Sequence, residues 1–505
     1  MNHVLNGLAA NVALPSELVD RLIADADAAT AGVLAGREDL THEQALALVS
    51  RDPDTAQQLA REGRLTAADI DPATQPDAAL TLLDRRAGNP EWARVLVRDP
   101  LVRNRERLAA CAGLPSDVVE TLAADPDVRV VAELAVWTTP DRAAVLARHP
   151  HAEVRRSVAA NEAAPPAVLA ALLTGGRLPP ARWCLVCDRE ETPFVHPPEC
   201  PRPDCDLLPG ESCDGSHDST VDETRQLALR NPATPTEAVV AFADHPSIRL
   251  RRLLAARPDL PPEVSERLAT DRDPGVRADL AENPAIGATL IRAMAGDPDH
   301  DVRRGLARNP RVPLDVLGRL AGTTRIGPTL LPRVAVASPP EVEELARSSN
   351  PEVRMLLAQR RDLPPEIRDT LAADPDAKVV KSVAPHPGLS DATLRATVDR
   401  HGVRVVAAVA ANPDATPALL ADLTRHEPPV RKALRAVARH PRATAPALLV
   451  CLSDRDAGPL AAGHPALPPP VVEELLTDTD PRTAEAAAAN PSLPLAVMSE
   501  LVPRR

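Results

Sequence analysis

Small clusters of Leu, Val and Ala recur along most of the chain, and Pro and acidic residues separate them. From Leu254 the chain reads LAARPDLPPEVSERLATDRDPGVRAD, and the same pattern begins again 26 residues later at Leu280 and once more at Leu306. A Pro marks the same point of most later units, at Pro232, Pro258, Pro284, Pro310, Pro387, Pro413, Pro441, Pro465 and Pro491, while Ser338 and Arg361 stand near the expected places between Pro310 and Pro387. This spacing indicates an internal repeat.

Each unit contains two short helical segments. The first begins at Pro261 and Pro262, because Pro presets the backbone for a helix start and loses no needed hydrogen bond there. A turn at Asp273 and Pro274 starts the second segment, and Asn283 ends it. Helices this short are marginal in water, so neighbouring units must stack and bury a continuous seam of Leu, Val and Ala. The sequence therefore predicts an all-α fold, an α-solenoid.

The repeat pattern divides the chain into three segments. Residues 1–176 hold about seven degenerate copies of the unit, and residues 227–505 hold about eleven. Between them, residues 177–226 lack the period and are rich in Cys, Pro and acid. We expect this stretch to be a small irregular insert that binds a metal.

The composition argues against several fold and function classes. The chain has 505 residues with 56 Pro, two Phe, three Trp and no Tyr. Strands favour aromatic residues, and central strands exclude Pro, which disfavours a β-sandwich or barrel. The chain has too few aromatic residues to build stacking platforms for single-stranded nucleic acid or aromatic cages for cations. Without a secretion leader or an apolar run long enough to span a bilayer, the protein is expected in the cytoplasm.

Three motifs recur in the repeats, namely LAxNP, xLPxxxLxxLA and DxDxxVR. Together they resemble the leucine-rich repeat variant family over nearly the whole chain outside residues 177–226. The resemblance implies a bacterial-type solenoid in which an α-helix alternates with a short 3₁₀-helix, wound into a right-handed superhelix. Periodicity alone indicates two short helical segments, and the 3₁₀ assignment of the second segment is what the resemblance implies. Some family members also carry an iron-sulfur module beside the repeats.

Five of the seven Cys fall within residues 184–213. In a reducing compartment, such clustering indicates metal ligation rather than disulfides. A CxxC turn points two thiolates at one ion, and a distant pair can close the tetrahedron. The preferred ligands are Cys184, Cys187, Cys205 and Cys213, with Cys200 and His217 as alternates. The competing interpretation is an unbound thiol tract.

The sequence does not decide between a zinc ion and an iron-sulfur cluster, because tetrahedral coordination by sulfur suits both. The pentapeptide CDGSH at residues 213–217 resembles the CDGSH iron-sulfur proteins, in which such a Cys and His join two earlier Cys, spaced CxC, around a two-iron cluster. This chain has no CxC, and Glu211 stands where that motif has Pro. A structural site joining two repeat arms is preferred over a redox or sensing role.

An Arg follows Val or Ile at the start of many second segments. The resulting row consists of Arg249, Arg277, Arg303, Arg354, Arg404 and Arg431, with Arg129 and Arg155 earlier in the chain. One interpretation is a partner-binding ladder for an acidic protein or a nucleic acid. The preferred one pairs each Arg with a nearby acid such as Asp273 or Asp301, because the net charge of the chain is −13 and disfavours binding of a polyanion.

The sequence contains no phosphate-binding glycine loop, no HExxH and no GxSxG, so catalysis has no motif to support it. We expect a non-catalytic helical-repeat scaffold that binds a protein partner, with a structural metal module between two repeat arms. Two alternatives stay open. One is an iron-sulfur redox or sensor protein whose cluster controls the geometry of the arms, and the other is a helical-repeat nucleic-acid-binding protein.

Overall fold

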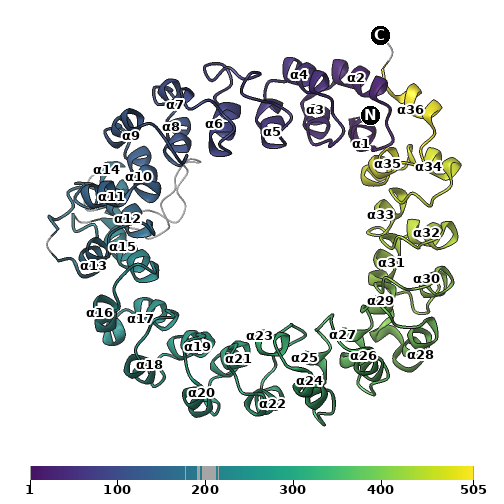
Figure 1. Cartoon of the computed structure of the whole chain (residues 1–505). Helices are drawn as coiled ribbons and strands as arrows, with labels where there is room; N and C mark the ends of the chain where they lie inside the picture. Colours follow the sequence, from purple (N-terminus) through teal and green to yellow (C-terminus); the bar gives the residue numbers. More distant parts are fainter. Residues whose placement is uncertain (1, 177, 190–193, 196–211, 214, 504–505) are drawn as a thin grey trace. The chain divides into compact units, whose positions relative to one another are not determined.

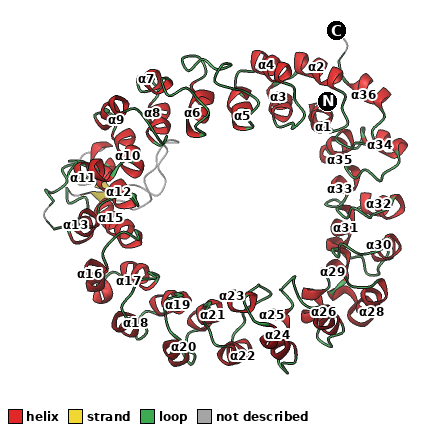
Figure 2. Cartoon of the chain, in the orientation of Figure 1, coloured by secondary structure: helices red, strands yellow, loops and turns green. Residues whose placement is uncertain are grey.

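The chain folds into a succession of short helices (Figure 2), in a computed structural model that describes residues 2–176, 178–189, 194–195, 212–213 and 215–503. The only strands in this part are β1 (Phe194–Val195) and β2 (Ser212–Cys213), which pair antiparallel. None of the described helices has the length and apolarity needed for a membrane span. The predicted α-solenoid is confirmed.

The chain divides into two compact units. Unit 1 consists of Met1–Arg64 and Val312–Arg505, and unit 2 consists of Leu65–Arg311. The segments 1–176, 177–226 and 227–505 follow the repeat pattern of the sequence and stay a prediction.

The helices of unit 1 are α1 (Asn2–Ala10), α2 (Ser16–Asp25), α3 (Ala28–Ala35), α4 (His42–Arg51), α5 (Thr55–Arg61), α22 (Leu314–Thr323), α23 (Pro332–Ala335), α24 (Pro339–Ala346), α25 (Pro351–Leu357), α26 (Pro365–Ala372), α27 (Ala377–Val383), α28 (Asp391–His401), the 3₁₀-helix η2 (Gly402–Arg404), α29 (Val406–Ala410), α30 (Pro417–Thr424), α31 (Arg431–Ala438), α32 (Ala445–Leu452), α33 (Gly458–Ala462), α34 (Pro469–Leu475), α35 (Pro481–Ala488) and α36 (Leu495–Leu501). Those of unit 2 are α6 (Pro76–Asp84), α7 (Trp92–Leu96), α8 (Val102–Ala109), α9 (Ser116–Ala123), α10 (Val128–Trp137), α11 (Pro140–Leu146), α12 (Ala152–Ala160), α13 (Pro166–Thr174), α14 (Leu185–Arg189), α15 (Asp218–Arg230), α16 (Thr236–Val239), the 3₁₀-helix η1 (Val240–Asp244), α17 (Ile248–Ala255), α18 (Pro262–Leu268), α19 (Pro274–Glu282), α20 (Ala288–Met294) and α21 (His300–Arg308).

Within each unit the helices form two rows (Figure 1). In unit 2, α17, α19 and α21 stack side by side in one row, while α16, α18 and α20 belong to the other. The seam between the rows is made of Leu, Val and Ala; Leu254, Leu280 and Leu306, one per repeat, are each fully buried. Two thin helical layers leave little room for large rings, which accounts for the shortage of aromatic residues.

The second segment of most repeats is an α-helix. In α19, Pro274 occupies the first turn, and the Asp273 carboxylate caps the helix by accepting from the backbone N–H groups of Gly275 and Val276. Such a cap stabilises a helix of nine residues that would otherwise be too short to persist. Within the described residues, 3₁₀ geometry is confined to η1 and η2.

A ladder of buried Asn side chains ties several repeats to the one before. The Asn283 amide donates to the carbonyl oxygens of Ala255 at 2.7 Å and Arg257 at 2.6 Å. One repeat later, Asn309 donates to the carbonyls of Ala281 and Asn283 at 2.9 and 2.7 Å. The Asn of the LAxNP motif therefore links repeats in addition to ending a helix, and each such bond contributes about 1 kcal/mol.

The same ladder continues from the last repeat of the chain to the first, within unit 1. The Asn11 amide donates to the carbonyl oxygens of Ala488 and Asn490 at 2.9 and 2.8 Å, which reproduces the geometry of Asn283. Helix α1 packs against α35, and Arg37 then donates to the Asn11 carbonyl at 2.8 Å. The first repeat thus occupies the position of the next repeat after α35.

Gly7 makes this stacking possible and provides a test of it. A Cβ added there would overlap the carbonyl oxygen of Glu485 and come within 2.9 Å of the Ala488 Cβ. We expect Gly7→Ala to weaken the contact of α1 with α35 by about 1–3 kcal/mol, seen as faster hydrogen exchange in α35. Gly32→Ala in α3 is the matched control, because its added Cβ has no neighbour within 4 Å. Equal exchange of α35 in wild type and Gly7→Ala would show that α1 does not stack there in solution.

Candidate metal centre

Three Cys and one His converge beside the repeat stack of unit 2. Cys184 is the residue before α14 and Cys187 lies within this helix, while Cys213 lies in β2 and His217 is the residue before α15. Their potential ligand atoms all lie within 4.8 Å of one another. Four residues separated by up to 33 positions in sequence therefore offer four donors to one point.

The local backbone arranges the sulfur atoms. The first turn of α14 brings the backbone N–H of Cys184 to the Cys187 Sγ at 3.1 Å. In the turn after β2, the N–H of Gly215 donates to the Cys213 Sγ at 3.4 Å, and both Gly215 and His217 have positive φ. Backbone N–H groups that donate to sulfur stabilise its thiolate form, and such hydrogen bonds to the ligands are usual around metal sites.

The distances between donors fit a single tetrahedral ion. The His217 Nδ1 lies 3.5 Å from the Cys213 Sγ and 3.7 Å from the Cys187 Sγ. Around one zinc ion with metal–sulfur bonds near 2.3 Å and metal–nitrogen bonds near 2.0 Å, the sulfur–nitrogen edge of a tetrahedron is about 3.5 Å. The His217 nitrogen thus already lies at the distance from two of the sulfur atoms that an ion would require.

Burial makes it unfavourable for the Cys donors to be thiolates without a bound ion. The exposed fraction is 1% for Cys184, 2% for Cys213 and 4% for His217. Burial raises the pKa of the Cys184 thiol to about 12, so without an ion this thiol holds its proton at neutral pH. A bound cation would replace that proton, and binding would therefore weaken as the pH falls.

The structure brings together part of the ligand set expected from the sequence. Cys184, Cys187 and Cys213 of the preferred four lie in the group, and the fourth position is held by His217, which the sequence offered as an alternate. Cys205 and the other alternate, Cys200, lie outside the described residues.

The centre is anchored to α12, a helix of the repeat stack. The His151 ring accepts from the backbone N–H of Glu153 through Nδ1 and faces the Asp188 carboxylate of α14 through Nε2 at 2.9 Å. The backbone N–H of Ala152 donates to the Trp183 carbonyl at 2.8 Å. Sequence reasoning missed His151, because a lone His before a helix is also an ordinary cap.

The repeat stack continues past the insert. The Asn231 amide donates to the carbonyls of Ala159 and Asn161 at 3.0 and 2.8 Å, and Asn161 donates in turn to Ala135 and Thr138. Helices α12 and α15 are therefore direct neighbours in one row. The insert interrupts the sequence of repeats without separating the repeats on either side of it.

The chain is similar to a solved structure described as a leucine-rich repeat variant with a novel repetitive protein structural motif. The identity is 19%, the match covers 54% of this chain and 87% of that one, and the TM-score is 0.29. No family model matches the sequence, and no curated protein matches it.

The predicted row of Arg side chains divides into paired and exposed members. Three of them bind an Asp side chain of the following repeat, in the pairs Arg277–Asp297, Arg354–Asp374 and Arg431–Asp454. The partner is thus the Asp one repeat on rather than Asp273 or Asp301. Arg303 donates to the carbonyls of Asp297 and Pro298. Arg249 and Arg404 are exposed.

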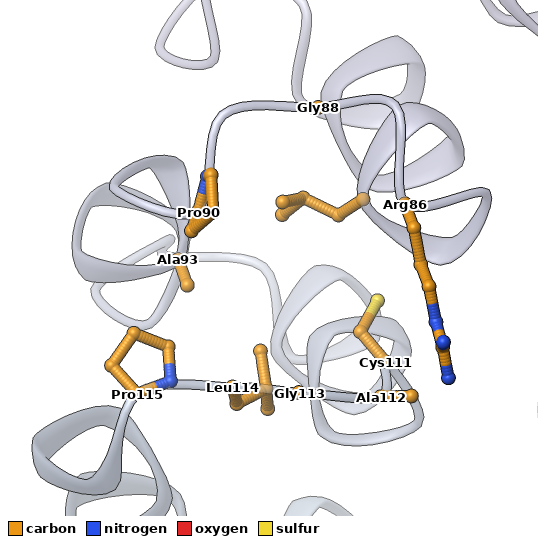
Figure 3. Close-up of a pocket in the computed structure, with 10 residues that line it drawn as sticks. Arg86, Gly88, Pro90, Ala93, Cys111, Ala112, Gly113, Leu114 and Pro115 are labelled. Atoms are coloured by element: carbon orange, nitrogen blue, oxygen red, sulfur yellow. The ribbon is translucent and has the colours of Figure 1, made fainter.

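Another cysteine, Cys111, lines a cavity of about 350 Å³ elsewhere in unit 2 (Figure 3). The Cys111 sulfur faces this cavity between Pro90, Ala93 and Leu114, and its Sγ donates to the Arg107 carbonyl. Burial raises the pKa of the Cys111 thiol to about 11. This thiol therefore behaves as a small apolar group and not as a nucleophile.

Proposed function

We propose that the chain is a non-catalytic helical-repeat scaffold of the cytoplasm that binds a partner protein, with a structural zinc centre formed by Cys184, Cys187, Cys213 and His217. The observation that carries the proposal is the Cys₃His group, buried except for the half-buried Cys187, beside a stack of repeats that continues past the insert. An ion at this point would fix the insert to α12 and α15, whose own packing does not depend on it.

The donor set supports a single zinc ion over a two-iron cluster. A cluster spreads its four ligands over two metal atoms, whereas the potential ligand atoms of Cys184, Cys187, Cys213 and His217 all lie within 4.8 Å of one another. Three thiolates and one imidazole are a common ligand set of structural zinc sites. The free state of all five described Cys also fits a reducing compartment.

The Asn hydrogen bonds between the repeats on either side of the insert disfavour the alternative in which a cluster sets the angle between two arms. Such control requires a joint that opens or closes at the metal. Here Asn231 and Asn161 hydrogen-bond across the position of the insert as other repeats do. The metal is therefore proposed to secure the insert and not to act as a hinge.

Partner binding finds support in an exposed aromatic side chain of unit 2. Trp137 on α10 is 64% exposed and borders a cavity of about 420 Å³ that shares Cys111 and Leu114 with the cavity of Figure 3. Trp is the residue that most often dominates binding energy at protein interfaces. An exposed Trp beside a hollow, in a chain with only three Trp, fits a docking position for an apolar side chain of a partner.

Quantitative affinity capture in the native host tests the scaffold proposal. Wild-type chain, Trp137→Ala and Leu495→Ala serve as baits; Leu495 is a matched control because it is exposed and apolar but lies in unit 1. We expect one protein to be enriched reproducibly with wild type and Leu495→Ala and lost with Trp137→Ala. If the wild-type bait enriches no protein above an unrelated bait, the scaffold proposal is contradicted.

A further inference from the structure

A cavity of about 840 Å³ opens in unit 1 where the repeat is irregular. Helix α23 has four residues, whereas α25 and α27 in the same row have seven each (Figure 1). The residues that would extend α23 instead form a loop after α22, with Gly327 at positive φ. The shortened helix leaves a space bounded by this loop, α25 and α27.

The lining of this cavity is strongly basic, in contrast to a chain with a net charge of −13. Four basic side chains and one acidic side chain line it, namely Arg325, Arg361, Lys378, Lys381 and Glu352. Two of the three Lys in the whole chain are among them. Lys378 pairs with Glu352, so the single carboxylate of the lining is already engaged.

The remaining cations differ from the Arg side chains of the repeat seam. Arg277 and Arg354 each have a buried Asp partner. Within the described residues, Arg325 and Lys381 have no ion pair, and both side chains are exposed at the cavity. Unpaired like charges around one cavity repel one another, and an anion placed between them would relieve that repulsion.

The rest of the lining suits the organic part of a ligand. Ala321, Pro328 and the buried Met355 supply an apolar wall, and Gln359 and Ser382 add polar groups. Pockets of about 300–1,000 Å³ with an apolar wall and a few convergent polar groups are typical of small-molecule sites. The cavity thus joins a cationic end to an apolar wall.

We propose that this cavity binds a small organic phosphate of nucleotide size. Its phosphate groups contact Arg325, Lys378 and Lys381, and its organic part lies against Met355. Lys and Arg are the usual donors to phosphate oxygens. The site is independent of the metal centre, because its residues all belong to unit 1 and those of the metal centre all belong to unit 2.

Calorimetric titration of the full chain at fixed ionic strength tests this site, with ATP, tripolyphosphate and adenosine as probes. We expect ATP to bind, tripolyphosphate to bind more weakly than ATP, and adenosine to give no measurable heat. The double variant Arg325→Gln with Lys381→Gln should bind ATP at least about tenfold more weakly. Its circular dichroism and thermal midpoint should match those of wild type, since both replaced side chains are exposed.

The matched control is Arg404→Gln with Lys432→Gln, which removes the same charge from exposed residues of unit 1 that do not line the cavity. We expect this control to bind ATP like wild type. No ATP heat at millimolar concentration, or equal weakening in the two double variants, overturns the proposal. Tripolyphosphate binding as tightly as ATP would overturn the assignment of Met355 to an organic group.

Discussion

Replacing Cys213 with Ser is expected to remove the metal from the protein and to release the insert from the repeat stack. Cys213 is one of the four proposed donors, and its sulfur lies 3.5 Å from the Nδ1 of His217, another of them. With three donors left, we expect metal retained after gel filtration to fall from one equivalent to roughly 0.1 or less per chain. Plasma mass spectrometry on the purified variant measures this loss.

The structural consequence of Cys213→Ser should be local. Amide exchange should accelerate by at least about tenfold in α14 and at the start of α15, while α17 and α19 keep their wild-type protection. Cys451→Ala serves as the control, since Cys451 is a buried thiol in α32 of unit 1 and should leave metal content unchanged. A Cys213→Ser variant that keeps a full equivalent of metal would contradict the assignment of this residue as a ligand.

Replacing Arg277 with Met is expected to destabilise its repeat strongly. The guanidinium donates to both oxygens of Asp297 at 2.8 and 3.0 Å and to the Asp271 carbonyl at 2.7 Å. The exposed fractions of the two side chains are 14% and 9%, so the variant would leave a buried carboxylate without its partner. Such a loss costs about 3–5 kcal/mol, measurable as a lower opening free energy by native-state hydrogen exchange in α19 and α21.

The effect of Arg277→Met should depend on pH. Burial alone would raise the pKa of Asp297, but hydrogen bonds from Arg277 and from the backbone N–H of Asp299 outweigh burial and lower the pKa. In wild type, the pair therefore stabilises the fold fully above about pH 4, and this stabilisation is lost as the pH falls through the lowered pKa. In the variant, Asp297 takes up a proton more readily, so the difference from wild type should narrow below about pH 4.

Arg249→Met is the matched control within the same row and the same unit. Arg249 is exposed, so its replacement should change the opening free energy by no more than about 0.5 kcal/mol. If Arg277→Met and Arg249→Met lower the opening free energy equally at pH 7, the ion pair of Arg277 with Asp297 contributes no more to stability than an exposed side chain does.

The repeat architecture could be predicted from the sequence because its causes are local. Pro262 and Pro274 set helix starts, and Asp273 caps a helix through neighbouring backbone N–H groups. The period then follows from positions 26 residues apart, such as Leu254 and Leu280. The second role of Asn283, as a donor to the preceding repeat, was hidden because its acceptors are backbone carbonyls, which leave no trace in sequence.

Contacts between distant segments could not be predicted in the same way. Asn11 donates hydrogen bonds to residues 477 and 479 positions away. The need for Gly at position 7 becomes visible only in the structure, where the backbone of Glu485 lies against it. At the metal centre, CxxC indicated two ligands by spacing, but the place of His217 depends on how β2 and α15 return to α14. The cavity at Lys381 likewise arises from the shortening of α23, which the repeat pattern shows only as an irregular stretch.

Metal analysis of the purified wild-type chain, combined with its ultraviolet and visible spectrum, tests the central claim most directly. We expect one zinc ion per chain and no absorption band between about 300 and 600 nm, because zinc has a filled d shell. Two iron atoms with inorganic sulfide and a brown colour, or a chain that binds no metal at all after purification without chelators, would contradict the zinc-anchored scaffold.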